Sequence, residues 1–196
     1  MTTESHPRLA IAITGAQGVG KTTLAATLKL EFDRLGIKPC WAHHNLGATA
    51  ATKGVPLGGN ANANSILEFS RLHIKRERQM AGGIHLLDRC FIDVLAYGRQ
   101  MCADQHILLD LVEELARASL TQIDLVVRIP IIPCLAESKS KNESSEFRFR
   151  IENSIATILD SMTARRLDVA STTPEDRVNE VFNAMNRHAL LAGFSR

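Results

Sequence analysis

The sequence predicts an α/β fold of three layers, in which a five-stranded parallel sheet carries helices on both faces. Two observations support this prediction. Short apolar segments alternate along the chain with longer segments in which apolar residues recur every three or four positions, a pattern typical of strands joined by helical crossovers. A glycine-rich segment directly follows the first apolar one. The 196 residues fit a single domain, 1–196, and ligands of such a domain are expected beyond the carboxyl ends of its strands.

Five apolar segments are predicted as strands. The first is apolar up to Thr14, which is the composition of a strand buried on both faces. The third ends at Asp88, and Pro130 ends the fourth because proline cannot donate to a strand ladder. The predicted strands are residues 9–14, 39–42, 84–87, 123–129 and 166–170.

Helices are predicted between these strands. Gly36 ends the first helix, and Asn64-Ser65 is expected to cap the third one. Thr173 to Asp176 form a capping box with a proline in the first turn of the last helix. The predicted helices are residues 23–30, an ambiguous short one within 43–53, 65–80, one ending near 99, 107–120, one from 147 and one from 174.

The glycine-rich segment fits the G-x-x-x-x-G-K-[ST] pattern of the phosphate-binding loop, or P-loop. Its glycines let backbone N–H groups approach phosphate oxygens, and the helix after it presents its positive end. Lys21 is expected to bridge the β- and γ-phosphates, Thr22 to ligate Mg²⁺, and Thr23 to lie near the α-phosphate. The predicted nucleotide-binding residues are Gly15, Ala16, Gln17, Gly18, Val19, Gly20, Lys21, Thr22 and Thr23.

A strand before this loop and a helix after it are the setting that a P-loop requires. The sequence therefore predicts a P-loop NTPase fold, with ATP and Mg²⁺ as cofactors. A tight glycine turn that binds nothing is the alternative, and it would leave the lysine without a partner. ATP is preferred to GTP because no N-K-x-D guanine signature follows a strand.

A second group of polar residues begins where the third strand ends, on the same edge of the sheet as the loop. Asp88 can accept a Mg²⁺-bound water or deprotonate an attacking hydroxyl. Arg89, Asp93 and Tyr97 follow at intervals of four, so they line one side of a helix. An Arg–Asp helix pair beside a half-buried tyrosine is the alternative interpretation. Because a P-loop is present, a catalytic and substrate-binding role is favoured.

These two motifs resemble the small P-loop kinases related to thymidylate kinase and the deoxynucleoside kinases. Among them, the chain is most similar to the AAA-labelled branch of ATPase/kinase-like proteins that includes the ribosylnicotinamide kinase domain. The specific matches are the loop and the run from Asp88 to Tyr97. Weaker matches are Gly54-Val55-Pro56-Leu57, Arg76-Glu77, Glu146-Phe147-Arg148 and Glu175-Asp176-Arg177.

The resemblance implies Mg-ATP-dependent transfer of the γ-phosphoryl group to a small acceptor, most simply a nucleoside or nucleotide. Asp88 would be the base or a Mg²⁺-linked carboxylate, and Arg89 a clamp on phosphate or substrate. Residues 134–150 occupy the position of the family's lid. A basic residue there would stabilise charge during transfer. The candidates are Arg148, which is preferred because it flanks the apolar stripe of its helix, and Lys139, Lys141 and Arg150.

The chain departs from this family after the second strand, where relatives commonly place an acidic residue in contact with the substrate. The segment from Trp41 to Gly47 contains no carboxylate. His43 is expected to hydrogen-bond the substrate in its place, with solvated histidines as the alternative. The predicted substrate-binding residues are thus His43, Arg89, Asp93 and Tyr97.

Composition narrows the partners. The formal charge is +2 with acidic and basic residues interleaved, so nucleic acid is not an expected partner. No apolar run approaches membrane-spanning length, and no signal-peptide pattern is present. Four widely spaced cysteines indicate reduced thiols and a cytoplasmic protein. A homodimer is allowed for, through the helices that carry Phe69 and Tyr97.

Two functions follow from these observations. The first is a kinase for a small acceptor, which the Asp88-Arg89 pair and the basic lid segment favour. The second is an ATP-binding switch or ATPase that acts on a protein partner, which the missing acidic residue near His43 favours. The kinase is preferred because Lys21, Thr22 and Asp88 are all present.

Overall fold

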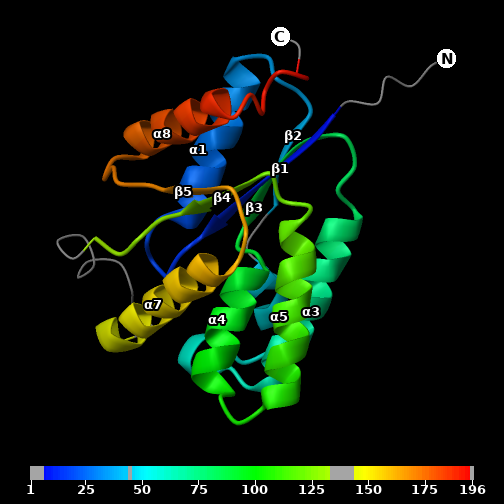
Figure 1. The fold of residues 1–196 in the computed structure, drawn as a ribbon, viewed down its shortest axis with the longest axis vertical. Coiled ribbons are helices and arrows are strands. Elements are labelled where there is room, and N and C mark those ends of the chain that lie inside the picture. Colours follow the sequence, from blue (N-terminus) through cyan, green and yellow to red (C-terminus); the bar gives the residue numbers. More distant parts are fainter. Residues whose placement is uncertain (1–6, 44–45, 133–143, 195–196) are drawn as a thin grey trace.

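The computed structural model describes residues 7–43, 46–132 and 144–194. It confirms the predicted fold class, because five parallel strands form one sheet in the order β2-β3-β1-β4-β5, with helices on both faces (Figure 1). The strands are β1 (Arg8–Thr14), β2 (Cys40–His43), β3 (Gly83–Asp88), β4 (Leu125–Arg128) and β5 (Arg166–Asp168).

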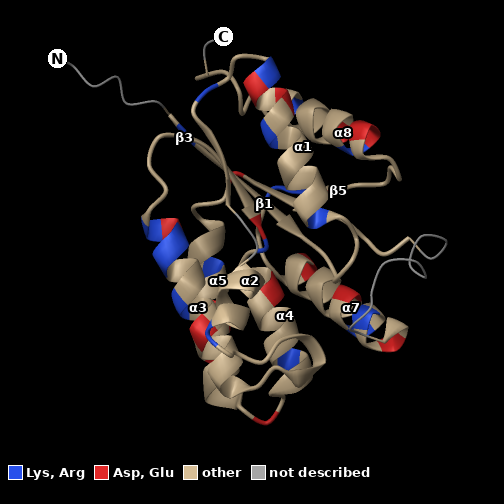
Figure 2. Cartoon of the chain, turned by 180° about the vertical axis from the view of Figure 1, so that it is seen from behind, with Lys and Arg blue, Asp and Glu red and all other residues tan. Residues whose placement is uncertain are grey.

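The helices occupy the segments between these strands. In chain order they are α1 (Lys21–Arg34), α2 (Leu46–Thr52), the 3-10 helix η1 (Gly58–Asn60), α3 (Ala63–Arg78), α4 (Phe91–Met101), α5 (His106–Leu120), α7 (Ser145–Ser161) and α8 (Pro174–Arg187). The ambiguous segment after β2 thus contains a short helix. Lysine, arginine and acidic residues are mixed along the outer helices α1, α3 and α7 (Figure 2).

The central strand β1 is buried on both faces, and its alternate residues enter two different cores. Leu9, Ile11 and Ile13 pack with the helices α1 and α8, whereas Ala12 packs with α4, α5 and α7. Figure 1 shows the same division, with α1 and α8 on one side of the sheet and α3, α4, α5 and α7 on the other. This arrangement explains why β1 is apolar at nearly every position.

The apolar stripes of the helices fill these two cores. In α1 the buried apolar side chains include Leu24, Leu28 and Phe32, and the Phe32 ring lies 4.9 Å from that of Phe182 on α8. The predicted stripe of α7 and its C-cap is buried throughout: Phe147, Ile151, Ile155, Ile158 and Met162. The helix α7 therefore packs on α4 in the way that its periodicity predicts.

Several helix boundaries differ from the prediction by one to four residues, and the ends of α1 and α3 are the clearest cases. The first helix runs on to Arg34, about one turn beyond the predicted end, and Gly36 follows it with φ of 74°. The third helix begins at Ala63, and its cap is Asn62 rather than Asn64-Ser65. The Asn62 side chain accepts the Ser65 N–H at 3.1 Å, and the Ser65 hydroxyl accepts the Asn62 N–H at 3.2 Å. At the last helix, the Thr173 hydroxyl accepts the Asp176 N–H at 3.2 Å and Pro174 follows it, as predicted. The predicted capping box is incomplete among the described contacts, because the Asp176 carboxylate accepts from the Thr173 hydroxyl at 2.7 Å rather than from the Thr173 N–H.

Along the described ranges, none of the helices is long and apolar enough to cross a bilayer. Cys40, Cys90 and Cys102 are buried free thiols, and Cys134 lies outside the described residues. Burial raises the pKa of the Cys40 thiol to about 12, so this side chain stays protonated and packs as a small apolar group.

The cap of α3 gives a stability prediction. Replacing Asn62 with alanine removes the acceptor of the Ser65 N–H, which should lower the free energy of unfolding by about 1 kcal/mol. Asn64 is exposed inside the same helix, so Asn64→Ala is a matched control that should leave stability unchanged or slightly higher. Urea unfolding followed by circular dichroism measures both; equal losses in the two variants would contradict the assigned cap.

Candidate functional site

The P-loop connects β1 to α1 at the edge of the sheet where β1, β3 and β4 end. Gly15, Gly18 and Gly20 have φ of 140°, 80° and 98°, a region that side chains disfavour. A Cβ on Gly15 would lie 2.4 Å from the Ile129 carbonyl oxygen, so this position requires glycine. Gly20 is also the N-cap of α1, without a side-chain cap. The first turn of α1 therefore offers backbone N–H groups to an anion.

Lys21 lies inside this loop. Only 6% of the residue is exposed, and its ammonium donates to the carbonyl oxygens of Gly15 at 2.8 Å and Ala16 at 2.7 Å. These two hydrogen bonds hold the ammonium against the backbone of the P-loop. A phosphate held by the loop would thus lie within reach of the lysine.

Thr22 meets Asp88 across the sheet edge. The threonine hydroxyl donates to the Asp88 Oδ2 at 2.5 Å, and Asp88 is almost fully buried. The other carboxylate oxygen, Oδ1, is buried and has no hydrogen-bond partner within the described part of the chain. Adjacent hydroxyl and carboxylate oxygens are hard ligands of the kind that Mg²⁺ prefers. A Mg²⁺ ion that is bound to a nucleotide needs only one or two ligands from the protein. The residues therefore fit a magnesium ion, although no group of three or more metal-ligating side chains occurs among the described residues.

The structure brings the predicted trio Arg89, Asp93 and Tyr97 together. The Arg89 guanidinium lies 3.1 Å from Asp93 Oδ1 and 5.6 Å from the centre of the Tyr97 ring. Asp93 Oδ2 accepts the Cys90 N–H at 3.0 Å and so caps α4. Arg89 itself precedes that helix and has φ of 75°, a conformation that is unusual for any residue except glycine.

The trio lines a cavity of about 810 Å³. Residues of α2, η1, α3 and α4 form its walls, and Gln17 of the P-loop lies at its border. The trio gives this cavity an ion pair and a hydroxyl. Phe69 and Tyr97, which were expected near a dimer face, both border this cavity. Sequence reasoning missed a further wall residue, His73, because it falls on the apolar stripe of its helix.

A second, smaller cavity of about 110 Å³ lies on the other side of the P-loop. Gly18, Gly20 and Thr23 border it, together with residues 130–132 after β4 and Thr172 before α8. Arg148 and Arg177 complete its wall. The P-loop thus separates two cavities of different size.

Both arginines donate to carbonyl oxygens of the P-loop. Arg148 Nε lies 2.8 Å from the Gln17 oxygen, and Arg177 Nη1 lies 2.8 Å from the Val19 oxygen. Among the four predicted lid candidates, Arg150 instead pairs with the exposed Glu146 at 3.4 Å. Lys139 and Lys141 lie outside the described residues, as do positions 134–143 of the predicted lid.

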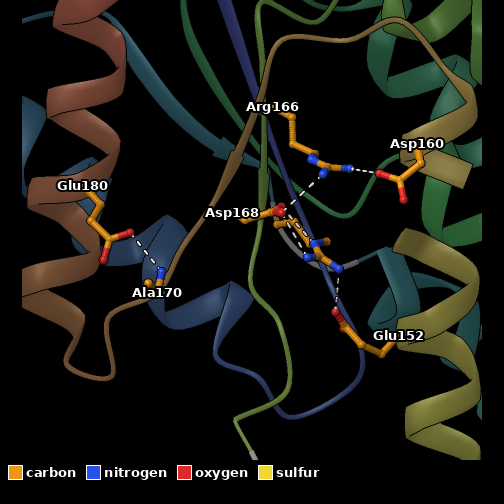
Figure 3. Close-up of polar contacts among 7 residues, drawn as sticks. Glu152, Asp160, Arg166, Asp168, Ala170 and Glu180 are labelled. Carbon is orange, nitrogen blue, oxygen red and sulfur yellow. Dashed lines mark hydrogen bonds and ion pairs between the residues drawn. The ribbon is translucent and has the colours of Figure 1, made fainter. Parts of the chain in front are cut away.

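An ion-pair network next to the P-loop joins β4, β5 and α7. Arg128, at the end of β4, donates to Asp168 at 2.9 and 3.0 Å and to Glu152 at 3.1 Å, and Arg166 extends the network to Asp160 (Figure 3). Burial raises the pKa of the Glu152 carboxyl, while Arg128 and a hydrogen bond from the Ala16 N–H oppose this shift. Glu152 therefore connects α7 to both the sheet and the P-loop. The sequence contained no local signal for this network.

His43 lies elsewhere on the sheet. Its Nε2 is 2.8 Å from Nδ1 of His85, and the two rings stack at 5.1 Å between centres. His43 is not one of the described residues that border either cavity. Its predicted contact with the substrate stays a prediction.

A family model described as an AAA domain matches residues 10–177. Two solved structures of NadR protein have similar folds: the complex with NR has a TM-score of 0.69, and the complex with NAD and AMP-PNP a TM-score of 0.64. Each is 14% identical in sequence and is matched over 91% of this chain, which spans only 52% and 50% of the respective NadR chains. No curated protein matches the sequence significantly.

Gly15 supplies a test of the loop. Gly15→Ala would drive a methyl group into the Ile129 carbonyl, so we expect a loss of about 2 kcal/mol or more in stability and no binding of a fluorescent ATP analogue. Gly36 also has positive φ but opens on free space, so Gly36→Ala should cost about 1 kcal/mol and leave nucleotide affinity unchanged. Nucleotide binding retained in Gly15→Ala would refute the close packing of the loop.

Proposed function

The chain belongs to the AAA domain family, a P-loop family as the sequence predicts, and we propose that it transfers the γ-phosphoryl group of Mg-ATP to a small acceptor, most simply a nucleoside or nucleotide. One observation carries this proposal: two cavities lie on opposite sides of a single P-loop. A phosphoryl transfer needs a donor and an acceptor on either side of the γ-phosphate, roughly in line.

The smaller cavity, at about 110 Å³, has room for only part of a nucleotide, and the residues that border it suit the phosphates. The loop amides and Lys21 would hold the phosphates, because charged phosphate oxygens are stronger acceptors than the carbonyls that the lysine now contacts. Arg148 and Arg177 border the same cavity and donate to neutral carbonyls. Each is close enough to turn to a phosphate, where a guanidinium stabilises the charge of the transferred group.

Thr22 and Asp88 would hold Mg²⁺ through the threonine hydroxyl and a carboxylate oxygen. When bound, the ion neutralises charge on the phosphates. Asp88 has a second oxygen, Oδ1, that accepts no hydrogen bond from the described residues. Asp88 is not among the described residues that border either cavity. We therefore assign it to the ion, with the base for the acceptor hydroxyl as its alternative role.

The larger cavity suits the acceptor. Arg89 is held by Asp93 and by the Tyr97 ring, so its guanidinium is fixed in place and can bind a polar group of the acceptor. The NadR structures were solved with NR and with NAD and AMP-PNP. At 14% sequence identity, these two structures support a shared fold but not a shared substrate. We therefore test nicotinamide riboside as one acceptor among others and do not assign it as the substrate.

The decisive experiment measures ADP release from Mg-ATP with pools of nucleosides, nucleoside monophosphates and nicotinamide riboside. We expect release that depends on one acceptor and falls at least about 100-fold in Lys21→Ala and Asp88→Asn. Lys29 lies on the same helix, is partly exposed and pairs with Asp33, so Lys29→Ala is the matched control and should retain full activity.

One observation favours a second function. Asp93 is the only acidic residue among the described residues of the larger cavity, and it is already paired with Arg89. A switch or ATPase that acts on a protein partner would need no acidic contact to an acceptor. ADP release at one slow rate, whatever acceptor is added, would favour this function over the kinase. The predicted homodimer and cytoplasmic location stay predictions.

A further inference from the structure

We propose that His73 is a neutral hydrogen-bond donor to the acceptor, and that Arg76 is the positioning residue that fixes its ring. The inference rests on the proposed kinase and deepens it on the acceptor side. It assigns a recognition role to a side chain of α3 that belongs to neither motif.

His73 is buried in the fold yet borders the larger cavity. Only 1% of the residue is exposed, and its ring packs 5.2 Å from the Phe91 ring at an angle of 44°. The cavity wall beside it carries Ile66 and Phe69 from the same helix. The imidazole is thus the polar group among the three α3 side chains that border the cavity.

Arg76 determines which ring nitrogen carries the proton. Its Nη2 lies 2.9 Å from His73 Nδ1. A guanidinium can only donate, so Nδ1 must accept and the proton of the neutral ring is on Nε2. No described residue accepts that N–H in a hydrogen bond. This nitrogen is not among the fully buried unpaired atoms of the described residues, so we place its N–H at the surface of the cavity that His73 borders, where an acceptor would supply a partner.

The ring is also kept uncharged. Burial lowers the pKa of His73 well below its ordinary value, and the nearby cations Arg76 and Arg89 lower it further. A neutral N–H donor binds the lone pair of an oxygen or a ring nitrogen. It therefore suits the uncharged polar groups of a nucleoside rather than a second cation.

Arg76 also contacts the backbone of Arg89, the residue proposed to bind the acceptor. Arg76 Nη2 donates to the Arg89 carbonyl at 2.7 Å, and its Nη1 lies 3.5 Å from the Asp88 carbonyl. These contacts stabilise the unusual backbone of Arg89. The buried guanidinium of Arg76 thus positions both His73 and Arg89.

Two substitutions separate recognition from structure. His73→Asn keeps an oxygen where Nδ1 contacts Arg76 but removes the distal N–H. His73→Gln places an amide N–H near the position of Nε2 but loses the Arg76 contact. We expect His73→Asn to raise KM for the acceptor about tenfold to a hundredfold, the effect of one lost hydrogen bond, and His73→Gln to stay within a few-fold of the parent chain. KM for ATP should not change in either variant. A larger loss in His73→Gln would mean that the ring only supports Arg76, and would overturn the proposal.

Imidazole ¹⁵N NMR tests the same proposal without turnover. We expect the His73 signal, assigned by its loss in His73→Asn, to show the neutral Nε2–H form in the full chain and to move when adenosine, uridine or nicotinamide riboside is added. Arg76→Lys should preserve that form, whereas Arg76→Leu should give a mixture of tautomers. An Nδ1–H form, or a signal that none of the three nucleosides moves, would overturn the inference. If no acceptor releases ADP but the signal moves, the kinase fails while the recognition role stands.

Discussion

The register between β1 and its two neighbours is the constraint on which the site depends. Ile13 pairs with Asp88 on β3, and Thr14 pairs with Arg128 on β4, so three strands end in step around the P-loop. This alignment brings the Thr22 hydroxyl to the Asp88 carboxylate. A slip of one residue would reverse which side chains face each helical layer. The same strand register therefore determines both the packing of the two cores and the geometry of the site.

The electrostatics of the site centre on the backbone of the loop. Lys21, Arg148 and Arg177 arrive from three different helices, and each donates to a loop carbonyl. The three cationic side chains are thus held beside the loop by hydrogen bonds to its carbonyl oxygens without a bound anion. Phosphate binding would exchange these partners for charged ones without first requiring the side chains to be brought together, which reduces the ordering cost of binding.

Local patterns predicted the fold and the residues that act within one motif. The P-loop, the strand ending at Asp88 and the helical spacing of Arg89, Asp93 and Tyr97 are all contained in short segments. The position of Arg148 also followed from the periodicity of its helix. His73 and Glu152 could not be found in this way, because each acts on elements remote in sequence. The α3 cap was misplaced because Asn62 and Asn64 offer similar signals, and the structure forms the reciprocal capping box between Asn62 and Ser65.

The anchoring of α7 limits how the domain can move. Arg148 holds its first turn to the P-loop, and Glu152 holds its second to Arg128. A rigid swing of the whole helix would break the partly buried Arg128–Glu152 ion pair and leave its charges without these partners, so such a swing is disfavoured. The Arg148 side chain can exchange its partner while the helix axis stays fixed. On this view α7 is a fixed wall beside the P-loop, and we expect rotation of the Arg148 side chain, rather than displacement of the helix, to bring its guanidinium to a bound phosphate.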